Sequence, residues 1–568
     1  MIVLEAKVLY QGVVLDRWCR LFRILSIPLF VSSFLLAAPP FKRAGDILRS
    51  HNQRLIHDRQ NRSLYDSNNS SYTRPATVDT RDSASPGGAC VVIDRVDTSE
   101  ITLIEKSRLD DIVSPLLRKC DTIDSINAVI DSINRIYLNR GYITSAAYLE
   151  PQDLSDGTLV ISALEGRIES VVGDGIYTGF LFYHARERHL NLRDLEAAME
   201  PLNRFRAYRT AMELYPGKKI GYSRIVLHQE RISSQIYGSG GFNNFGTKST
   251  GRFQFDGDIF WENPLGVNGL LHMNFNMAKR GGRPDGARSY NANYSVPAGR
   301  NLLEFSVSGF RYLRMIEGVN KLYRSEGRTR SLSVGMKRRV YRSRHFGGKV
   351  ELSLAREISD NYLAGVHLAL SATTLNILSI GYRQEFFFKN CEGYLNIRYS
   401  RGLGGPGSRT PPMREESFDK VVVEAGLLSE FDAIEGVSPL RYTLSFYAQS
   451  ASKMVVPSQQ IGVGGPYSVR GFMSEGALSG ASGFYLRNEL STRMATSAGV
   501  FAPYMALDVG AVKHDSFSYG GSICGGALGL RLKLGHLFAD ISYSAPLRYP
   551  SSFPAKERFA GVSLRYNF

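Results

Sequence analysis

The chain has 568 residues, which is too long for one ordinary domain and indicates two or more. Its formal net charge of +16 would suit nucleic acid or an anionic membrane as a partner. The basic residues are, however, mixed with Asp and Glu and form no run of the nucleic-acid-binding kind, so the composition argues against a nucleic-acid partner.

Residues 1–38 have the pattern of a secretion signal peptide. An apolar run, Ile24–Leu36, is followed by the small residues Ala37 and Ala38 and preceded by three arginines, Arg17, Arg20 and Arg23. The run is shorter than the roughly 20 residues that a helix needs to span a bilayer. A short anchor helix that is not removed is the alternative. Cleavage near Ala38 would leave the mature protein outside the cytoplasm, where disulfides persist.

Two further segments precede the folded part of the chain. Residues 39–62 predict a basic, weakly amphipathic helix over Phe41–Arg62, and a disordered basic tail is the alternative. Residues 63–88 are rich in Ser, Asn, Asp, Thr, Pro and Gly, which is typical of a flexible linker.

Residues 89–168 predict a small α+β domain with the order β-α-α-β-β. A strand in "CVVIDRV" precedes a short helix near Leu109–Lys119 and a longer helix that ends at Gly141, with Thr122 or Asp121 as its N-cap. Two strands, "YITSAAYLE" and "GTLVISALEGRIESV", complete the domain. One face of the longer helix carries Ile123, Ile126, Ile130, Ile133 and Tyr137.

Residues 169–231 predict a second, shorter α+β domain. It contains a helix over Leu192–Leu202 and strands near Thr210–Leu214 and Ser223–Gln229. The two domains together separate the linker from the C-terminal part of the chain.

The five cysteines allow several arrangements. Cys19 belongs to the signal peptide. Cys90 and Cys120 flank one short segment, and a disulfide between them would close a loop of about thirty residues and add about 3–4 kcal/mol. Two free buried thiols are the alternative. Cys391 and Cys524 lie far apart in the chain, and the sequence is compatible both with their pairing and with separate thiols.

Residues 232–568 show a period of two, which predicts strands with one apolar and one polar face. In "GRFQFDGDIFW", "LLHMNFNMAKR" and "RYTLSFYAQ", apolar and aromatic residues alternate with polar ones. A soluble sandwich is the alternative, but the pattern continues further than one sandwich usually runs, and its polar faces suit a water-filled lumen. The sequence therefore predicts a closed transmembrane β-barrel of about sixteen antiparallel strands.

The chain ends in "GVSLRYNF", where Val562, Leu564, Tyr566 and Phe568 share one face. A terminal aromatic residue is typical of the last strand of an outer-membrane barrel, so Tyr566 and Phe568 are a candidate assembly signal.

Motifs of enzymes are absent from the sequence. It contains no G-x-S-x-G elbow, P-loop, HExxH or CxxC motif, and its ten histidines do not cluster at ligand spacing. We therefore predict no catalytic residue, no cofactor and no metal site.

Several stretches resemble one family. "YLNRGYITSAAYLEPQDLSDGTLVISALEGRIE" resembles the first POTRA domain of two-partner secretion transporters, the ShlB/FhaC/HecB haemolysin secretion/activation family, and "LNRFRAYRTAMELYPGKKIGYSRIVL" is similar to the second. "NNFGTKSTGR", "NPLGVNGLL", "LRNELS" and "YSAPL" resemble barrel signatures of this family. The resemblance covers most of the chain after the signal.

"GGPYSVRGF" contains Val469, Arg470, Gly471 and Phe472, which match the VRG(F/Y) tip of a loop that folds into the barrel lumen in this superfamily. The resemblance implies that this loop lies around residues 455–480 and that Arg470 pairs with Asp508 of "YMALDVG", where Tyr504 and Gly510 complete the wall motif. Because a loop in a wet lumen has little apolar burial to fix it, we expect the Arg–carboxylate pair to hold it. A solvated arginine is the alternative.

The resemblance implies an outer-membrane translocator of a Gram-negative bacterium. Its periplasmic POTRA domains would recognise an unfolded exoprotein, which crosses the barrel without ATP; residues 39–62 would plug the resting pore. Its partners would be a secreted exoprotein of haemolysin, adhesin or contact-dependent toxin type, the barrel assembly machinery and outer-membrane lipid. An assembly factor that inserts other barrels is the alternative, although such proteins usually carry three or five POTRA domains.

Overall fold

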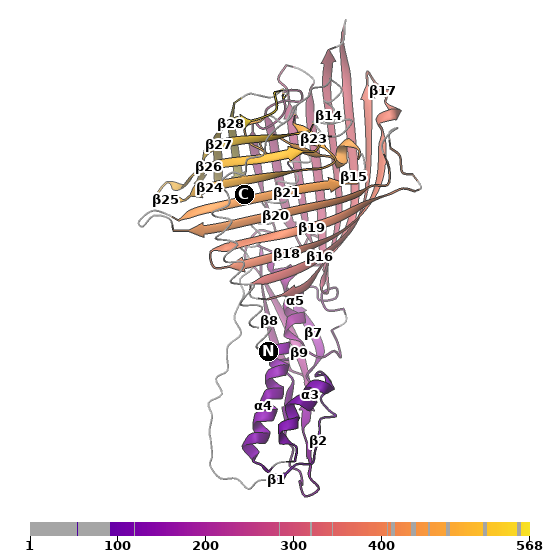
Figure 1. Cartoon of the computed structure of the whole chain (residues 1–568), viewed down its shortest axis with the longest axis vertical. Helices are drawn as coiled ribbons and strands as arrows, with labels where there is room; N and C mark the ends of the chain where they lie inside the picture. The colour runs from indigo at the N-terminus through magenta and orange to yellow at the C-terminus, as the bar shows by residue number, and fades with distance from the viewer. Residues whose placement is uncertain are drawn as a thin grey trace.

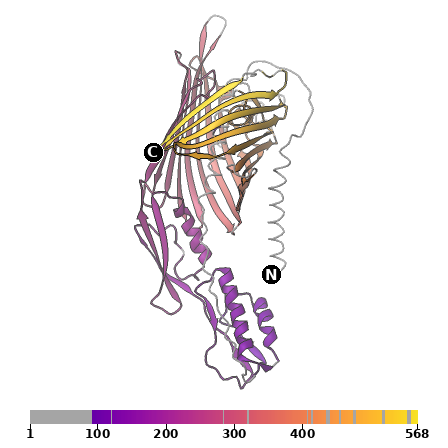
Figure 2. The same ribbon diagram turned by 90° about the vertical axis from the view of Figure 1, so that its left-hand side faces the viewer.

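The computed structural model describes Arg54 and residues 91–568, apart from the short gaps 119, 184, 283–284, 318–320, 344, 406, 411–414, 433–438, 453–454, 473–476, 515–519, 552 and 554–557. The molecule is elongated, with a β-barrel at one end and two small α+β domains in a row at the other (Figures 1 and 2).

The first α+β domain is built around helix α4 (Ile123–Arg140), which follows helix α3 (Lys106–Val113) and the 3-10 turn η1 (Ser114–Leu116). Its short strands are β1 (Val91–Val92), β2 (Arg95–Asp97), β3 (Cys120–Asp121), β4 (Ala146–Tyr148), β5 (Thr158–Val160) and β6 (Ser162–Leu164). They form the pairs β1–β3, β2–β5 and β4–β6, of which β2–β5 is parallel.

The predicted apolar face of α4 is buried except at its first residue. Ile126, Ile130, Ile133 and Tyr137 are buried, whereas Ile123 is 54% exposed because it begins the helix, beyond the packed part of the domain. Gly141 ends the helix with a φ of +92° in the left-handed region, as helix C-termini favour. The shorter predicted helix ends earlier than expected, at Val113, and continues as the 3-10 turn η1, which has a proline in its first turn.

The second domain packs helix α5 (Leu192–Asn203) beside a sheet of β7 (Arg167–Asp174), β8 (Tyr208–Pro216) and β9 (Tyr222–Arg231). The strand order is β7-β9-β8, with β7 parallel and β8 antiparallel to β9. The predicted continuous strand "GTLVISALEGRIESV" is therefore divided into β5, β6 and β7, which belong to different sheets. None of the helices in the described residues is long and apolar enough to cross a membrane.

From Ile236 onward the strands form a closed antiparallel barrel (Figure 1). The first barrel strand, β10, pairs with the last, β29. The short segments β17 and β25 are not counted as separate barrel strands, because β16 pairs directly with β18 and β24 pairs directly with β26. The described chain therefore forms a barrel of 16 strands, which confirms the prediction. The strands are β10 (Ile236–Asn243), β11 (Gln254–Glu262), β12 (Leu270–Lys279), β13 (Gly286–Ala298), β14 (Asn301–Glu317), β15 (Leu322–Arg342), β16 (Phe346–Leu363), β17 (Val366–His367), β18 (Thr373–Phe388), β19 (Cys391–Leu403), β20 (Asp419–Phe431), β21 (Leu440–Ala451), β24 (Gly483–Thr492), β25 (Met494–Thr496), β26 (Gly499–Val512), β27 (Gly521–Leu534), β28 (Leu537–Arg548) and β29 (Phe559–Asn567).

Side chains of the wall alternate between lipid and lumen. Phe255 on β11 and Phe275 on β12 are 54% and 48% exposed, whereas the neighbouring Asp256 and Asn274 are 4% and 8% exposed. Since successive side chains of a strand point to opposite faces, the apolar set faces outward and the polar set lines the interior.

Candidate functional site

The segment between β21 and β24 packs against the inner face of the barrel wall. It contains the 3-10 turn η3 (Pro457–Gln459) and a hairpin of β22 (Ile461–Val463) and β23 (Leu478–Gly480). Our expectation that this loop has little apolar burial is wrong, because Val469 and Phe472 are 0% and 1% exposed. They belong to a cluster of loop and wall residues, namely Val422, Tyr447, Ile461, Val463, Val469, Phe472, Leu478, Tyr485, Val512, Ile523 and Phe553.

Arg470 lies between Val469 and Phe472 and binds the carboxylate of Asp508 on β26. Its Nε donates to Oδ2 at 2.6 Å and its Nη2 to Oδ1 at 2.8 Å, and its backbone N–H donates to Oδ2 at 3.0 Å. Arg470 is 8% and Asp508 0% exposed. A bidentate pair of this kind is strong and directional, and each charge neutralises the other where water is largely excluded.

Glycines let the loop approach the wall closely. Gly471 has a φ of +92°, and a Cβ there would lie 2.3 Å from the carbonyl oxygen of Ala545 on β28. A Cβ at Gly510 would lie 2.4 Å from Val463, and one at Gly525 on β27 would lie 1.8 Å from the carbonyl oxygen of Arg470. Any side chain at these positions would have to displace the loop.

Glu489 on β24 supplies a second carboxylate, which sequence reasoning missed. Nη1 of Arg470 and Nη2 of Arg531 both donate to Oε2 of Glu489 at 2.8 Å. Arg531 also lies 4.3 Å from the ring centroid of Tyr504, whose hydroxyl donates to Asp540 at 2.9 Å. The wall-motif residue Tyr504 is therefore linked to Arg470 through Arg531 and Glu489.

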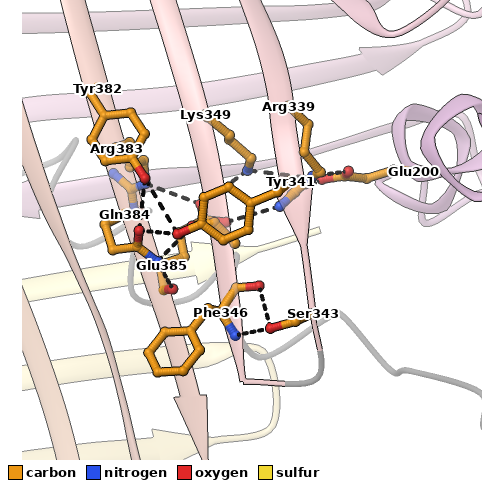
Figure 3. Close-up of polar contacts among 11 residues, drawn as sticks. Glu200, Arg339, Tyr341, Ser343, Phe346, Lys349, Tyr382, Arg383, Gln384 and Glu385 are labelled. Carbon is orange, nitrogen blue, oxygen red and sulfur yellow. Dashed lines mark hydrogen bonds and ion pairs between the residues drawn. The ribbon is translucent and has the colours of Figure 1, made fainter. Parts of the chain in front are cut away.

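Helix α5 is joined to three barrel strands through a network of charged side chains (Figure 3). Glu200 forms an ion pair with Arg339 on β15, which lies 3.5 Å from Glu385 on β18. Lys349 on β16 and Arg383 on β18 lie 3.0 Å and 3.1 Å from the carboxylate of Glu385. The network fixes the end of α5 at the entrance of the barrel.

The chain that follows α5 is also attached to the barrel, through the fully buried carboxylate of Glu262. Glu262, the last residue of β11, accepts the backbone N–H groups of Arg206 and Ala207 at 2.7 Å and 2.9 Å. Arg204 donates through Nη1 to the hydroxyl of Ser295 on β13 at 2.8 Å, and burial lowers the pKa of Arg204 to about 10. Both contacts fix the second domain to the barrel wall.

The two α+β domains meet where α5 begins. The backbone N–H of Leu192 donates to the carbonyl oxygen of Gly141 at 2.8 Å. His189 lies beside this contact, with Nε2 3.7 Å from Oε2 of Glu165. Burial, together with the positive charge of Arg167, lowers the pKa of His189.

The predicted N-terminal segments lie outside the described residues. This applies to the signal peptide (1–38), to the linker (63–88) and to the candidate plug (39–62) except Arg54. Nη2 of Arg54 lies 3.6 Å from Oδ1 of Asp256, a carboxylate of the lumen wall.

The cysteine predictions have different outcomes. Cys524 is a free thiol, so it does not pair with Cys391. The backbone of Cys120 pairs with that of Val92, but Cys90 lies outside the described residues, so the Cys90–Cys120 disulfide stays a prediction.

The C-terminal strand closes the barrel. Tyr566 lies opposite Gly240, and the backbones of Phe568 and Gly238 exchange two hydrogen bonds of 3.0 Å. Tyr566 and Phe568 are 53% and 62% exposed on the outer face.

Comparison with protein families identifies both parts of the chain. The model of the haemolysin secretion/activation protein ShlB/FhaC/HecB matches residues 221–532, and the model of the ShlB-type POTRA domain matches residues 91–166. The expected resemblance is thus confirmed.

Individual proteins agree with these matches. The chain is 31% identical over 489 residues to the outer membrane transporter CdiB of Escherichia coli (strain 536 / UPEC), covering 82% of this chain and 81% of the relative. It is 24% identical over 465 residues to the hemolysin transporter protein ShlB of Serratia marcescens, covering 80% and 82%. The solved structure of CdiB from Escherichia coli, at 28% identity, matches with a TM-score of 0.79 over 94% of this chain and 100% of that chain.

These matches favour a secretion transporter over the barrel assembly factor. The barrel lies in the outer membrane, and the first α+β domain matches the ShlB-type POTRA domain; POTRA domains are periplasmic in this family. The chain therefore belongs to the ShlB/FhaC/HecB haemolysin secretion/activation family of two-partner secretion transporters, a membership that implies a secreted exoprotein as its partner.

Proposed function

We propose that the protein exports an unfolded exoprotein through its barrel and that the loop around Arg470 controls the pore. The observation that carries this proposal is the polar attachment of a lumen loop to one side of the wall. Arg470 binds Asp508 and Glu489, and these contacts can break and re-form without separating any barrel strands. The cargo would be of haemolysin, adhesin or contact-dependent toxin type.

The POTRA domains would receive the exoprotein through an exposed strand edge. β8 lies at the edge of its sheet and pairs only with β9 in the described chain. Leu214 and Tyr215 near its end are 37% and 42% exposed. An extended segment of the exoprotein can add to such an edge by backbone hydrogen bonds, while side-chain contacts give specificity.

Export would proceed without ATP and without catalysis by this chain. Folding of the exoprotein outside the cell would bias the direction, because a folded segment cannot return through the barrel. The exposed aromatic face that ends in Tyr566 and Phe568 supports recognition of the last strand by the barrel assembly machinery.

Residues 39–62 would occupy the resting pore. The contact of Arg54 with Asp256 supports this role, because Asp256 is a buried carboxylate on the inner wall. Deleting residues 39–62 should raise the single-channel conductance in a planar bilayer. Unchanged conductance would remove the plug from the proposal while leaving export intact.

Co-expression with the exoprotein encoded beside this chain tests export, scored as exoprotein outside the cell. Arg470→Ala should abolish most export while the barrel remains assembled. Arg398→Gln is the matched control, because it removes a different arginine of the inner wall, which lies 3.3 Å from Glu351. Normal export by Arg470→Ala, or equal loss in both variants, would contradict the role of the loop.

A further inference from the structure

The outer face of the barrel carries a row of arginines at the end opposite the POTRA domains. Arg288 on β13 pairs with Arg311 on β14, which pairs with Arg328 on β15. Arg330 follows two residues later on the same face of β15. We define these four residues as the arginine belt. β14 and β15 reach far beyond the rest of the wall at this end of the barrel (Figure 1).

The arginine belt begins where the lipid-facing apolar surface ends. On β15, Leu332 and Val334 are 56% and 48% exposed on the same face, and Arg330 and Arg328 follow toward the outer end. On β13 the exposed Tyr290 precedes Arg288 in the same direction. Because the POTRA domains lie in the periplasm, this boundary is at the outer leaflet of the membrane.

The charges of the belt are only partly neutralised by the protein. Glu326 accepts a hydrogen bond from Nη2 of Arg311 at 2.7 Å and also lies 2.6 Å from Nε of the neighbouring Arg324. Asp360, opposite Arg328 in the register, lies 3.3 Å from His367.

The other arginines of the belt have no such partner. In the described part of the chain, the side chains of Arg288, Arg328 and Arg330 make no hydrogen bond or ion pair. Like charges directly opposite each other on neighbouring strands destabilise a sheet unless a counter-charge lies between them. The row therefore fits an anion supplied from outside the chain.

We propose that the arginine belt binds the phosphate groups of the anionic glycolipid of the outer leaflet. Guanidinium groups bind phosphate oxygens in a bidentate manner. The acyl chains of the same glycolipid would lie along the exposed apolar residues directly below, so one lipid molecule satisfies both surfaces. A soluble anion would satisfy only the arginines.

The test uses the full chain in detergent micelles and measures binding of diphosphoryl lipid A by native mass spectrometry. Each arginine near an anionic lipid surface raises the affinity by about fivefold. The variant Arg288→Gln/Arg311→Gln/Arg328→Gln removes three such contributions and should therefore bind about 100-fold more weakly. The corresponding triple lysine variant keeps the charge but cannot bind phosphate in a bidentate manner, so it should lose affinity, though less than the triple glutamine variant.

Arg338→Gln is the matched control, because Arg338 is an exposed arginine toward the other end of β15. It should bind lipid A as the unchanged protein does. Dephosphorylated lipid A should bind weakly, and inorganic phosphate at equal concentration should not displace lipid A. Equal binding by the triple glutamine variant, no preference for the phosphorylated lipid, or displacement by inorganic phosphate would overturn the proposal. Each variant is first checked for a folded barrel by its heat-modifiable migration in gels.

Discussion

Arg470→Ala should loosen the lumen loop far more than the loss of one surface arginine would. The substitution removes two side-chain hydrogen bonds to Asp508 and one to Glu489. It also leaves Asp508, which is 0% exposed, with an uncompensated charge. Breaking a buried ion pair by removing one partner costs about 3–5 kcal/mol. The free energy of opening the loop should fall by this amount, while the barrel strands keep their pairing.

Hydrogen exchange of the full chain in detergent measures this opening directly. The backbone amides of Gly465 and Ser468 donate hydrogen bonds within the loop, to the carbonyl oxygens of Val469 and Gly465. They should exchange about 100- to 3000-fold faster in Arg470→Ala, because each 1.4 kcal/mol corresponds to a factor of ten. Amides of β13 should be unchanged. Arg398→Gln serves as the control and should leave exchange in the loop as it is. An increase below about threefold in Arg470→Ala would refute the reasoning and show that the apolar cluster alone holds the loop.

Three further predictions concern the same regions. Glu489→Gln should speed loop exchange by only about 10- to 100-fold, because Asp508 still binds Arg470; an effect as large as that of Arg470→Ala would contradict this ranking. Gly525→Ala should displace the loop and raise single-channel conductance with the barrel intact, and unchanged conductance would refute the close approach. The pKa of His189 is lowered in the folded domain, so its protonation favours unfolding, and stability should fall as the pH drops below about 6.5. Thermal unfolding at pH 7.5 and 5.5 measures this, and His189→Gln should flatten the difference; an equal pH dependence in that variant would rule His189 out.

The barrel was predictable because lipid and water impose opposite demands on alternate residues. Phe255 and Phe275 must face lipid, and Asp256 and Asn274 must avoid it, so a period of two appears in the sequence itself. Ile123 was wrongly predicted to be buried. The helical period of apolar residues extends into the first turn of α4, but the residues that pack against the helix do not extend that far.

The loop site depended on contacts that no local pattern contains. Arg470 and Asp508 belong to segments 38 residues apart, and only the resemblance to a family joined them. Glu489 lies in the quoted signature "LRNELS". It is four residues from Tyr485 on β24, so the alternation of side chains along the strand places both on the lumen face. That alternation was the available signal for its role. The apolar cluster was missed because a water-filled lumen was assumed to be polar throughout, whereas Val469 and Phe472 bring their own apolar surface to the wall.

The second α+β domain and the lumen loop are attached to different strands of the barrel. The second α+β domain is attached to β11, β13, β15 and β16 through residues such as Glu262 and Arg339. The segment Val469–Phe472 touches β24, β26, β27 and β28. We therefore expect a pulling force from cargo bound in the periplasm to act on the N-terminal strands of the barrel. The loop attached to the C-terminal strands could then detach from the wall while the periplasmic domain stays bound to the barrel.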